Sequence, residues 1–126
     1  SSTGIRFRDN HASTIRGYVY ANNSNQIGFL DPNGSWRLYV NSTSNVVCVN
    51  HFIPASNNSY DLGTSNNRWR NLYVNDLQLS NESQKEEGGN SVDGTWGDWT
   101  LQEGEDNIYM INNRSGKKFK MLLQEV

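Results

Sequence analysis

The sequence predicts an all-β fold, and three observations lead to it. Short runs that alternate polar and apolar residues recur along the chain, and a period of two is that of a strand with one buried face. Clusters of Asn, Ser, Gly and Asp, which favour turns, separate these runs. The apolar spacing of a helix is nowhere maintained for more than about two turns.

Five strands are predicted in the first half of the chain. They are expected at Gly4–Asp9, Thr14–Ala21, Gln26–Asp31, Ser35–Asn41 and Asn45–Phe52. The clearest hairpin joins the third and fourth, because Pro32 presets a turn dihedral and Asn33–Gly34 tolerates positive φ. In the fourth strand the alternation places Trp36, Leu38 and Val40 on one face, which we expect to be buried.

The second half begins with a turn-rich stretch, 54–67, that marks a boundary or a return crossing. Residues 68–79 predict a short turn followed by a strand, and residues 80–91 predict a polar linker or exposed loop. Three further strands, expected at Thr95–Gln102, Asn107–Asn112 and Lys117–Glu125, form an antiparallel meander in which Phe119, Met121 and Leu123 share one face. The predicted organisation is a β-rich domain over 1–79, the linker over 80–91 and a small C-terminal β-meander over 92–126.

The chain holds little aliphatic material for a core of its own. Leu, Ile, Val and Phe make up 27 of the 126 residues, close to the level of about 20% at which disorder becomes plausible. Disorder also requires a high net charge, whereas the formal charge is −2, and four Trp, six Tyr and four Phe favour order. Small domains of this kind can complete their burial between subunits, so we expect an oligomer.

Several partners are disfavoured by the sequence. No run approaches the roughly 18 apolar residues of a membrane span, and no signal segment opens the chain, so we expect a soluble protein without membrane insertion. A pI near 5.6 without a basic face argues against nucleic acid. Cys48 has no partner cysteine and lies among valines, which predicts a buried, inert thiol. Because the chain starts at Ser1 without an initiator Met, we expect further segments upstream.

Three segments carry a resemblance to a known family. The segment Asp61–Val74, DLGTSNNRWRNLYV, resembles one found near the distal end of bacteriophage tail fibres and tailspikes, just before their C-terminal folding-chaperone domain. The run Asn25–Trp36 is similar to the strand units of these fibres, and Val92–Val126 is similar to the termini of fibre-like structural proteins of marine phages.

The resemblance implies an intertwined homotrimer about a threefold axis, located on the virion in a tail fibre or other external fibre. It implies that residues 1–79 form a fibre or shaft domain and that 92–126 form a tip or cap. The implied function is trimerisation and attachment to a host cell-surface glycan or protein, without catalysis. One feature departs from the family: an endosialidase-type chaperone begins with a Ser-Asp self-cleavage site, and this chain contains no Ser-Asp dipeptide. A β-rich cap is therefore expected in place of the helical chaperone.

The candidate residues fall into two groups. The trimer core is predicted to contain Trp69, Leu72, Val74, Leu77 and Leu79, which form the densest apolar series beside a turn-rich boundary, and Trp36, which lies in a patterned apolar stripe. Receptor binding is assigned to Trp96, Trp99 and Tyr109, because exposed aromatic rings contact sugars and proteins with little loss of entropy. At i and i+3 of a strand, Trp96 and Trp99 are expected to point to opposite faces.

No cofactor, metal or catalytic residue is predicted. His11 and His51 lie forty residues apart, and either could bind a metal only where three copies meet on an axis. No Ser has the context of a nucleophile, and the acidic residues lie in loops where they are expected to be solvated. Two alternatives to an attachment tip stay open: a purely structural trimerisation cap, and a fragment of a carbohydrate-cleaving tailspike that would need paired carboxylates.

Overall fold

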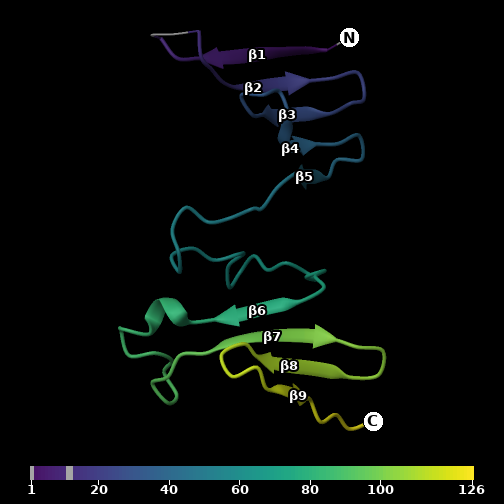
Figure 1. The fold of residues 1–126 in the computed structure, drawn as a ribbon. Coiled ribbons are helices and arrows are strands. Elements are labelled where there is room, and N and C mark those ends of the chain that lie inside the picture. The colour runs from purple at the N-terminus through teal and green to yellow at the C-terminus, as the bar shows by residue number, and fades with distance from the viewer. Residues whose placement is uncertain (1, 11–12) are drawn as a thin grey trace. The chain divides into compact units, whose positions relative to one another are not determined.

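The computed structural model describes residues 2–10 and 13–126. The described chain is all-β, as predicted: it forms one five-stranded and one four-stranded antiparallel sheet, with a single 3₁₀ turn (Figure 1). The chain divides into two compact units, Ser1–Ile53 and Pro54–Val126, each containing one sheet. Among the described residues, no helix is long and apolar enough to cross a membrane.

The N-terminal unit is a meander in which each strand pairs with the next in the chain. Its strands are β1 (Thr3–Arg8), β2 (Ile15–Ala21), β3 (Ile27–Leu30), β4 (Trp36–Val40) and β5 (Val46–Cys48). All five coincide with predicted strands. The last is shorter than expected, since the chain bends after Val49, whose N–H donates to the carbonyl of Arg37.

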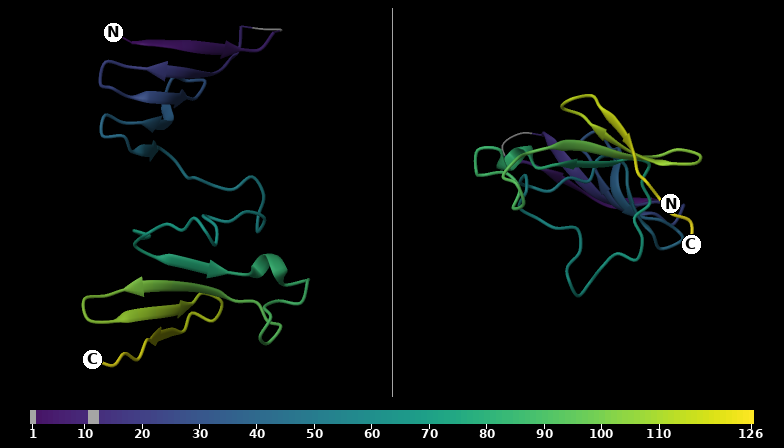
Figure 2. Two further views of the ribbon diagram at one scale, coloured as in Figure 1. Left: turned by 180° about the vertical axis from the view of Figure 1, so that it is seen from behind. Right: turned by 90° about the horizontal axis from the view of Figure 1, so that it is seen from below.

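Three hairpin turns of this sheet share one construction, and their connections alternate between its two ends (Figure 2). Each begins with a residue whose side-chain oxygen accepts backbone N–H groups two and four residues later: Asn22, Asp31 and Asn41. In each, the fourth residue has positive φ: Asn25, Gly34 and Ser44. Asx side chains stabilise turns in this way. The recurrence accounts for much of the asparagine and serine between the strands.

One face of the N-terminal sheet is almost entirely apolar. Cross-strand partners lie on the same face, and two rows of partners run across all five strands: Ile5, Val19, Phe29, Leu38 and Cys48, and Thr3, Ala21, Ile27, Val40 and Val46. We call the apolar members of these rows, together with Phe7, the N-terminal apolar face. The N-terminal unit itself supplies no second layer over this face: Phe29 is 55% exposed and Val46 69% exposed.

The opposite face carries aromatic rings beside glycines. Tyr20 and Tyr39 are the cross-strand partners of Gly28, and the ring of Trp36 lies 5.9 Å from that of Tyr20 and 5.1 Å from that of Tyr39. A Cβ atom at Gly28 would overlap the carbonyl oxygen of Leu38 and the backbone of Tyr39. The glycine therefore allows the close approach of the two tyrosine-bearing strands.

The prediction that Trp36 shares a buried face with Leu38 and Val40 is wrong. Phe29 pairs with Leu38 while Leu30 pairs with Trp36, so a β-bulge at Arg37 places Trp36 on the face opposite Leu38. Trp36 and Leu38 are half-buried, and Val40 is exposed. The alternation of the sequence does not reveal the extra residue.

The C-terminal sheet is also a meander. Its strands are β6 (Leu77–Ser80), β7 (Asp98–Glu103), β8 (Ile108–Asn112) and β9 (Lys118–Lys120), and the 3₁₀ turn η1 (Glu82–Gln84) follows β6. The predicted boundaries at 79/80 and 91/92 differ from the compact units, which divide at Ile53/Pro54. The reason is that Leu77 and Leu79 pair with β7, which joins the end of the predicted shaft domain to the meander.

This sheet has one apolar and one polar face. The C-terminal apolar face consists of Leu77, Leu79, Trp99, Leu101, Ile108, Met110 and Phe119. On the other face the Thr100 hydroxyl donates to Gln78 Oε1 (2.7 Å), and Asn113 Nδ2 donates to the same hydroxyl (3.0 Å). The last strand is shorter than predicted, since β9 ends at Lys120. The Met121 N–H still donates to the carbonyl of Ile108, whereas Leu123 lies beyond the paired residues.

Neither sheet encloses a hydrophobic core within the described part of the chain. No hydrophobic side chain there is fully buried, and Thr100, 6% exposed, is the one buried residue. Domains are ordinarily built from two packed layers that share a core. Each unit of this chain provides a single layer.

The turn at Asp31 gives a testable dependence on pH. The Ser35 N–H, which donates to the carboxylate, is the main cause that lowers the pKa of Asp31, with Arg37 adding to the effect against the opposing influence of burial. A lowered folded-state pKa adds stability above the unfolded pKa, and that stability is lost as pH falls through the folded value. Stability should therefore decrease below about pH 4.

Asp31→Asn should retain the turn, since Asn occupies the same position in the turns at Asn22 and Asn41. It removes the titrating group, so its melting temperature should fall less steeply with acid than that of the parent. Melting followed by circular dichroism from neutral to acidic pH measures both. Superimposable profiles for the variant and the parent would contradict the role assigned to Asp31.

Candidate functional site

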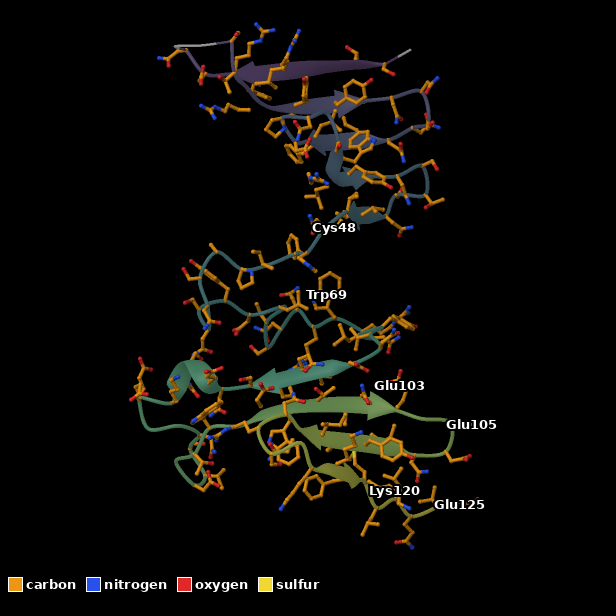
Figure 3. All side chains as sticks on the ribbon, in the orientation of Figure 1. Cys48, Trp69, Glu103, Glu105, Lys120 and Glu125 are labelled. Atoms are coloured by element: carbon orange, nitrogen blue, oxygen red, sulfur yellow. The ribbon has the colours of Figure 1, made fainter. Side chains whose placement is uncertain are left out.

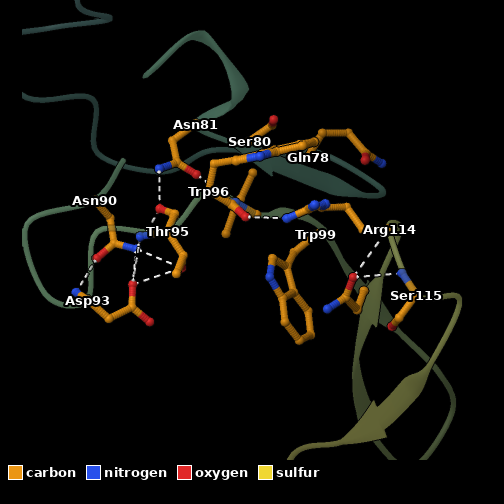
Figure 4. Close-up of a pocket in the computed structure, with 13 residues that line it drawn as sticks. Gln78, Ser80, Asn81, Asn90, Asp93, Thr95, Trp96, Trp99, Arg114 and Ser115 are labelled. Carbon is orange, nitrogen blue, oxygen red and sulfur yellow. Dashed lines mark hydrogen bonds between the residues drawn. The ribbon is translucent and has the colours of Figure 1, made fainter. Parts of the chain in front are cut away.

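The C-terminal unit carries an open pocket of about 980 Å³ (Figure 4). Four segments form it: β6, the loop 90–97, the start of β7 and the turn between β8 and β9. Its lining residues are Gln78, Leu79, Ser80, Asn81, Asn90, Asp93, Thr95, Trp96, Gly97, Trp99, Asn112, Arg114 and Ser115. This volume is at the upper end of the range of about 300–1,000 Å³ for small-molecule sites.

Hydrogen bonds within the loop fix one end of the pocket. Asn90 Oδ1 accepts the N–H groups of Val92 (2.8 Å) and Asp93 (3.0 Å), and Asn90 Nδ2 donates to Asp93 Oδ1 (2.7 Å). Thr95 donates to the same carboxylate oxygen from its hydroxyl (2.8 Å) and from its N–H (3.1 Å). The Thr95 hydroxyl and then the Asn90 amide lower the pKa of Asp93, so its carboxylate stays ionised at neutral pH.

Asn81 fastens this loop to the end of β6. Its Oδ1 accepts the N–H of Gly97 (2.9 Å), and its Nδ2 donates to the carbonyl of Thr95 (3.2 Å). Both groups of one amide are thus used across 14 to 16 residues of chain. The loop is consequently held in place by specific bonds although it lies at the surface.

The aromatic residues of the pocket are held by ring contacts. The guanidinium carbon of Arg114 lies 3.7 Å from the ring centroid of Trp96, and its Nη1 donates to the Trp96 carbonyl (2.9 Å). Lys85 Nζ lies 5.9 Å from the same ring. Trp99 packs against Phe119, with ring centroids 5.7 Å apart. Trp96 and Trp99 are both half-buried.

The structure brings together two of the three predicted binding residues. Trp96 and Trp99 line the same pocket, which contradicts the expectation of opposite faces, because Trp96 precedes β7 and strand alternation does not apply to it. Tyr109 is not among the lining residues: it lies in β8 opposite Gln102 and Lys120, on the polar face. Sequence reasoning missed Arg114 and the Asn90–Thr95 loop, which only the tertiary arrangement places beside the tryptophans.

The predicted trimer-core residues lie in three settings. Trp36 packs with tyrosines in the N-terminal sheet, and Leu77 and Leu79 belong to the C-terminal apolar face. The other three precede β6 in the stretch 54–76, all of it described and without a strand. There Trp69, labelled in Figure 3, is 69% exposed, Leu72 is 62% exposed and Val74 is 52% exposed.

The remaining candidates for chemistry are the possible metal ligands and the single cysteine. No group of three or more His, Cys, Asp or Glu side chains is arranged there to hold a metal ion. His51 is exposed, and His11 lies outside the described residues. The prediction of a buried thiol is wrong within one chain: Cys48 is exposed on the edge strand β5 (Figure 3). Its Sγ donates to the carbonyl of Asn50 (2.9 Å).

Comparisons with models of protein families, with curated proteins and with solved structures find no match for this chain. The chemistry of the pocket is therefore assessed from its own residues. Its lining combines two tryptophans with amides, hydroxyls, one carboxylate and one guanidinium. Such a mixture, apolar rings with a few convergent polar groups, suits the recognition of a polyhydroxylated ligand.

Proposed function

We propose that this chain is the distal domain of a homotrimeric virion fibre, in which neighbouring copies cover the N-terminal apolar face and the part of the C-terminal apolar face that lies outside the pocket lined by Leu79 and Trp99. The observation that carries the proposal is that large apolar side chains are aligned on one face of each sheet without being buried: most are exposed on the N-terminal apolar face, and those of the C-terminal apolar face are half-buried or exposed. The resemblance of Asp61–Val74 to phage fibre segments supports three copies and a place on an external fibre.

The two apolar faces are larger than the scattered apolar residues that are normal on the surface of a soluble protein. On the N-terminal apolar face, Ile5, Ile27 and Phe29 are each more than half exposed. Full burial of one such side chain contributes about 1.5–3 kcal/mol, and two layers with a shared core are the usual means of obtaining it. Because both sheets lack a second layer among the described residues, identical copies packed symmetrically provide the simplest partner.

Phe29→Ser should abolish or strongly weaken the trimer. The change removes a ring from the middle of the N-terminal apolar face, and loss of a buried Phe costs about 3–5 kcal/mol. Arg6→Ser is the matched control, because Arg6 is exposed on the opposite face of the same sheet, where its cross-strand partner is Tyr18. Light scattering and thermal melting of both variants measure the effect.

If Phe29→Ser retains the mass and melting temperature of the parent while Arg6→Ser lowers them, the wrong face has been assigned to the interface. Trp69→Ala in the same assay tests whether the segment before β6 also packs between subunits. A stable dimer instead of a trimer would agree with covered apolar faces but would contradict the threefold symmetry of a fibre.

Attachment to a host surface is the second proposed role, and the pocket lined by Trp96 and Trp99 favours it. The pocket is preformed by the bonds of Asn81 and Asn90, so binding would order few additional groups. Asp93 is the one carboxyl group among its lining residues, whereas glycoside hydrolysis generally uses two. These features support binding rather than cleavage; without a ligand, the domain would serve as a structural cap.

Trp99→Ala should weaken binding to a glycan array by about tenfold or more, because rigid aromatic anchors supply much of such affinity. Tyr60→Ala is the control, since Tyr60 is 66% exposed and lies outside the pocket lining. Both variants need the trimer mass and melting temperature of the parent. A parent trimer that binds no glycan or protein of a host surface would support the structural cap.

A further inference from the structure

The pocket has a hydrogen-bond acceptor at one end and hydrogen-bond donors at the other. This separation determines which class of ligand fits it. Asp93, an acceptor, lies at one end with Asn90, and Arg114 lies at the other with Ser115 (Figure 4). Trp99 lies between these ends in the same view. A ligand that spans the pocket therefore meets a carboxylate, an indole ring and a guanidinium.

Arg114 is exposed, makes defined contacts with Trp96, and has no anionic partner among the described residues. Its stacking on Trp96 and its single bond to the Trp96 carbonyl hold the guanidinium plane. None of the ion pairs among the described residues includes Arg114. A guanidinium presents five N–H donors in a fork that matches a planar anion. Its remaining donors have no acceptor within the described chain.

The neighbouring groups at this end of the pocket also have donors left over. Asn112 Oδ1 is occupied by the N–H groups of Arg114 and Ser115, whereas its Nδ2 has no acceptor among the described residues. The hydroxyl oxygen of Ser115 accepts the N–H of Lys117, which leaves its hydrogen to donate. This end consequently offers N–H and O–H groups to a ligand rich in acceptors.

We propose that the pocket binds an acidic saccharide, with its anionic substituent against Arg114 and a sugar ring against Trp99. The shared chemistry is a carboxylate or sulfate carried on a hydroxyl-rich ring. Hydroxyl groups of the same ligand donate to the ionised Asp93 at the other end. This inference rests on the proposed attachment function and specifies the class of its ligand.

The test uses the parent trimer and three probes of equal length: galacturonic acid oligomers, sulfated galactose oligomers and neutral galactose oligomers. Titration calorimetry should show the acidic probes bound at least about tenfold more tightly than the neutral one, since hydrogen bonds to charged groups are the stronger ones. This preference should shrink as salt is raised. The two acidic probes distinguish a carboxylate from a sulfate as the preferred anion.

Arg114→Gln should remove the preference for acidic probes while leaving the affinity for the neutral probe within about twofold. Lys118→Gln is the matched control, because Lys118 is an exposed cation of β9 outside the pocket lining, and it should keep the preference. Arg114→Lys retains the charge without the fork and should be intermediate. Melting temperature and mass confirm that each variant is folded and assembled.

The proposal is overturned if neutral and acidic probes bind equally, if salt has no effect on the parent, or if Arg114→Gln binds as the parent does. The salt series on the parent keeps this test decisive even if Arg114→Gln does not fold. A parent trimer that binds no probe overturns the ligand class and leaves the fibre architecture standing, whereas a folded monomeric parent overturns the architecture itself.

Discussion

Each unit contains a single sheet and supplies no second layer over its own apolar face, and this constraint decides how the chain can be stable. A single sheet can satisfy its backbone hydrogen bonds internally, but it cannot remove one face from water without a partner. Phe29 and Leu79 illustrate the consequence, since each lies in a regular strand and remains about half exposed. On the proposed assembly, folding and association would be a single process, and stability would depend on protomer concentration.

Turns and polar side-chain networks define the strand ends and the strand pairing, which no hydrophobic core does among the described residues. The Asx turns at Asn22, Asp31 and Asn41 define where each strand ends, and the polar network of Thr100 fixes the pairing of β6 with β7. A one-residue slip in pairing would reverse the two faces of a sheet, so accurate turns are needed to keep the apolar residues together. This explains why so much of the sequence is polar although one face of each sheet is apolar.

The strands and turns were predictable because they are encoded within about ten residues of sequence. The bulge at Arg37 was not, since the alternation of Trp36, Leu38 and Val40 is unaltered by it. The pairing of Leu77–Ser80 with β7 was also missed, because nothing local distinguishes a strand of one unit from a strand of the next. The pocket was predicted in part. Its tryptophans could be chosen from the sequence because exposed aromatic residues are typical of binding surfaces, whereas Arg114 is brought to Trp96 only by the fold.

Covered apolar faces are the central claim, and the native mass of the folded protein tests it most directly. Light scattering on the purified chain should give three times 14.3 kDa, and the melting temperature should rise with protein concentration because assembly stabilises the folded state. A protein of 14.3 kDa that melts cooperatively at a temperature independent of concentration would contradict the account.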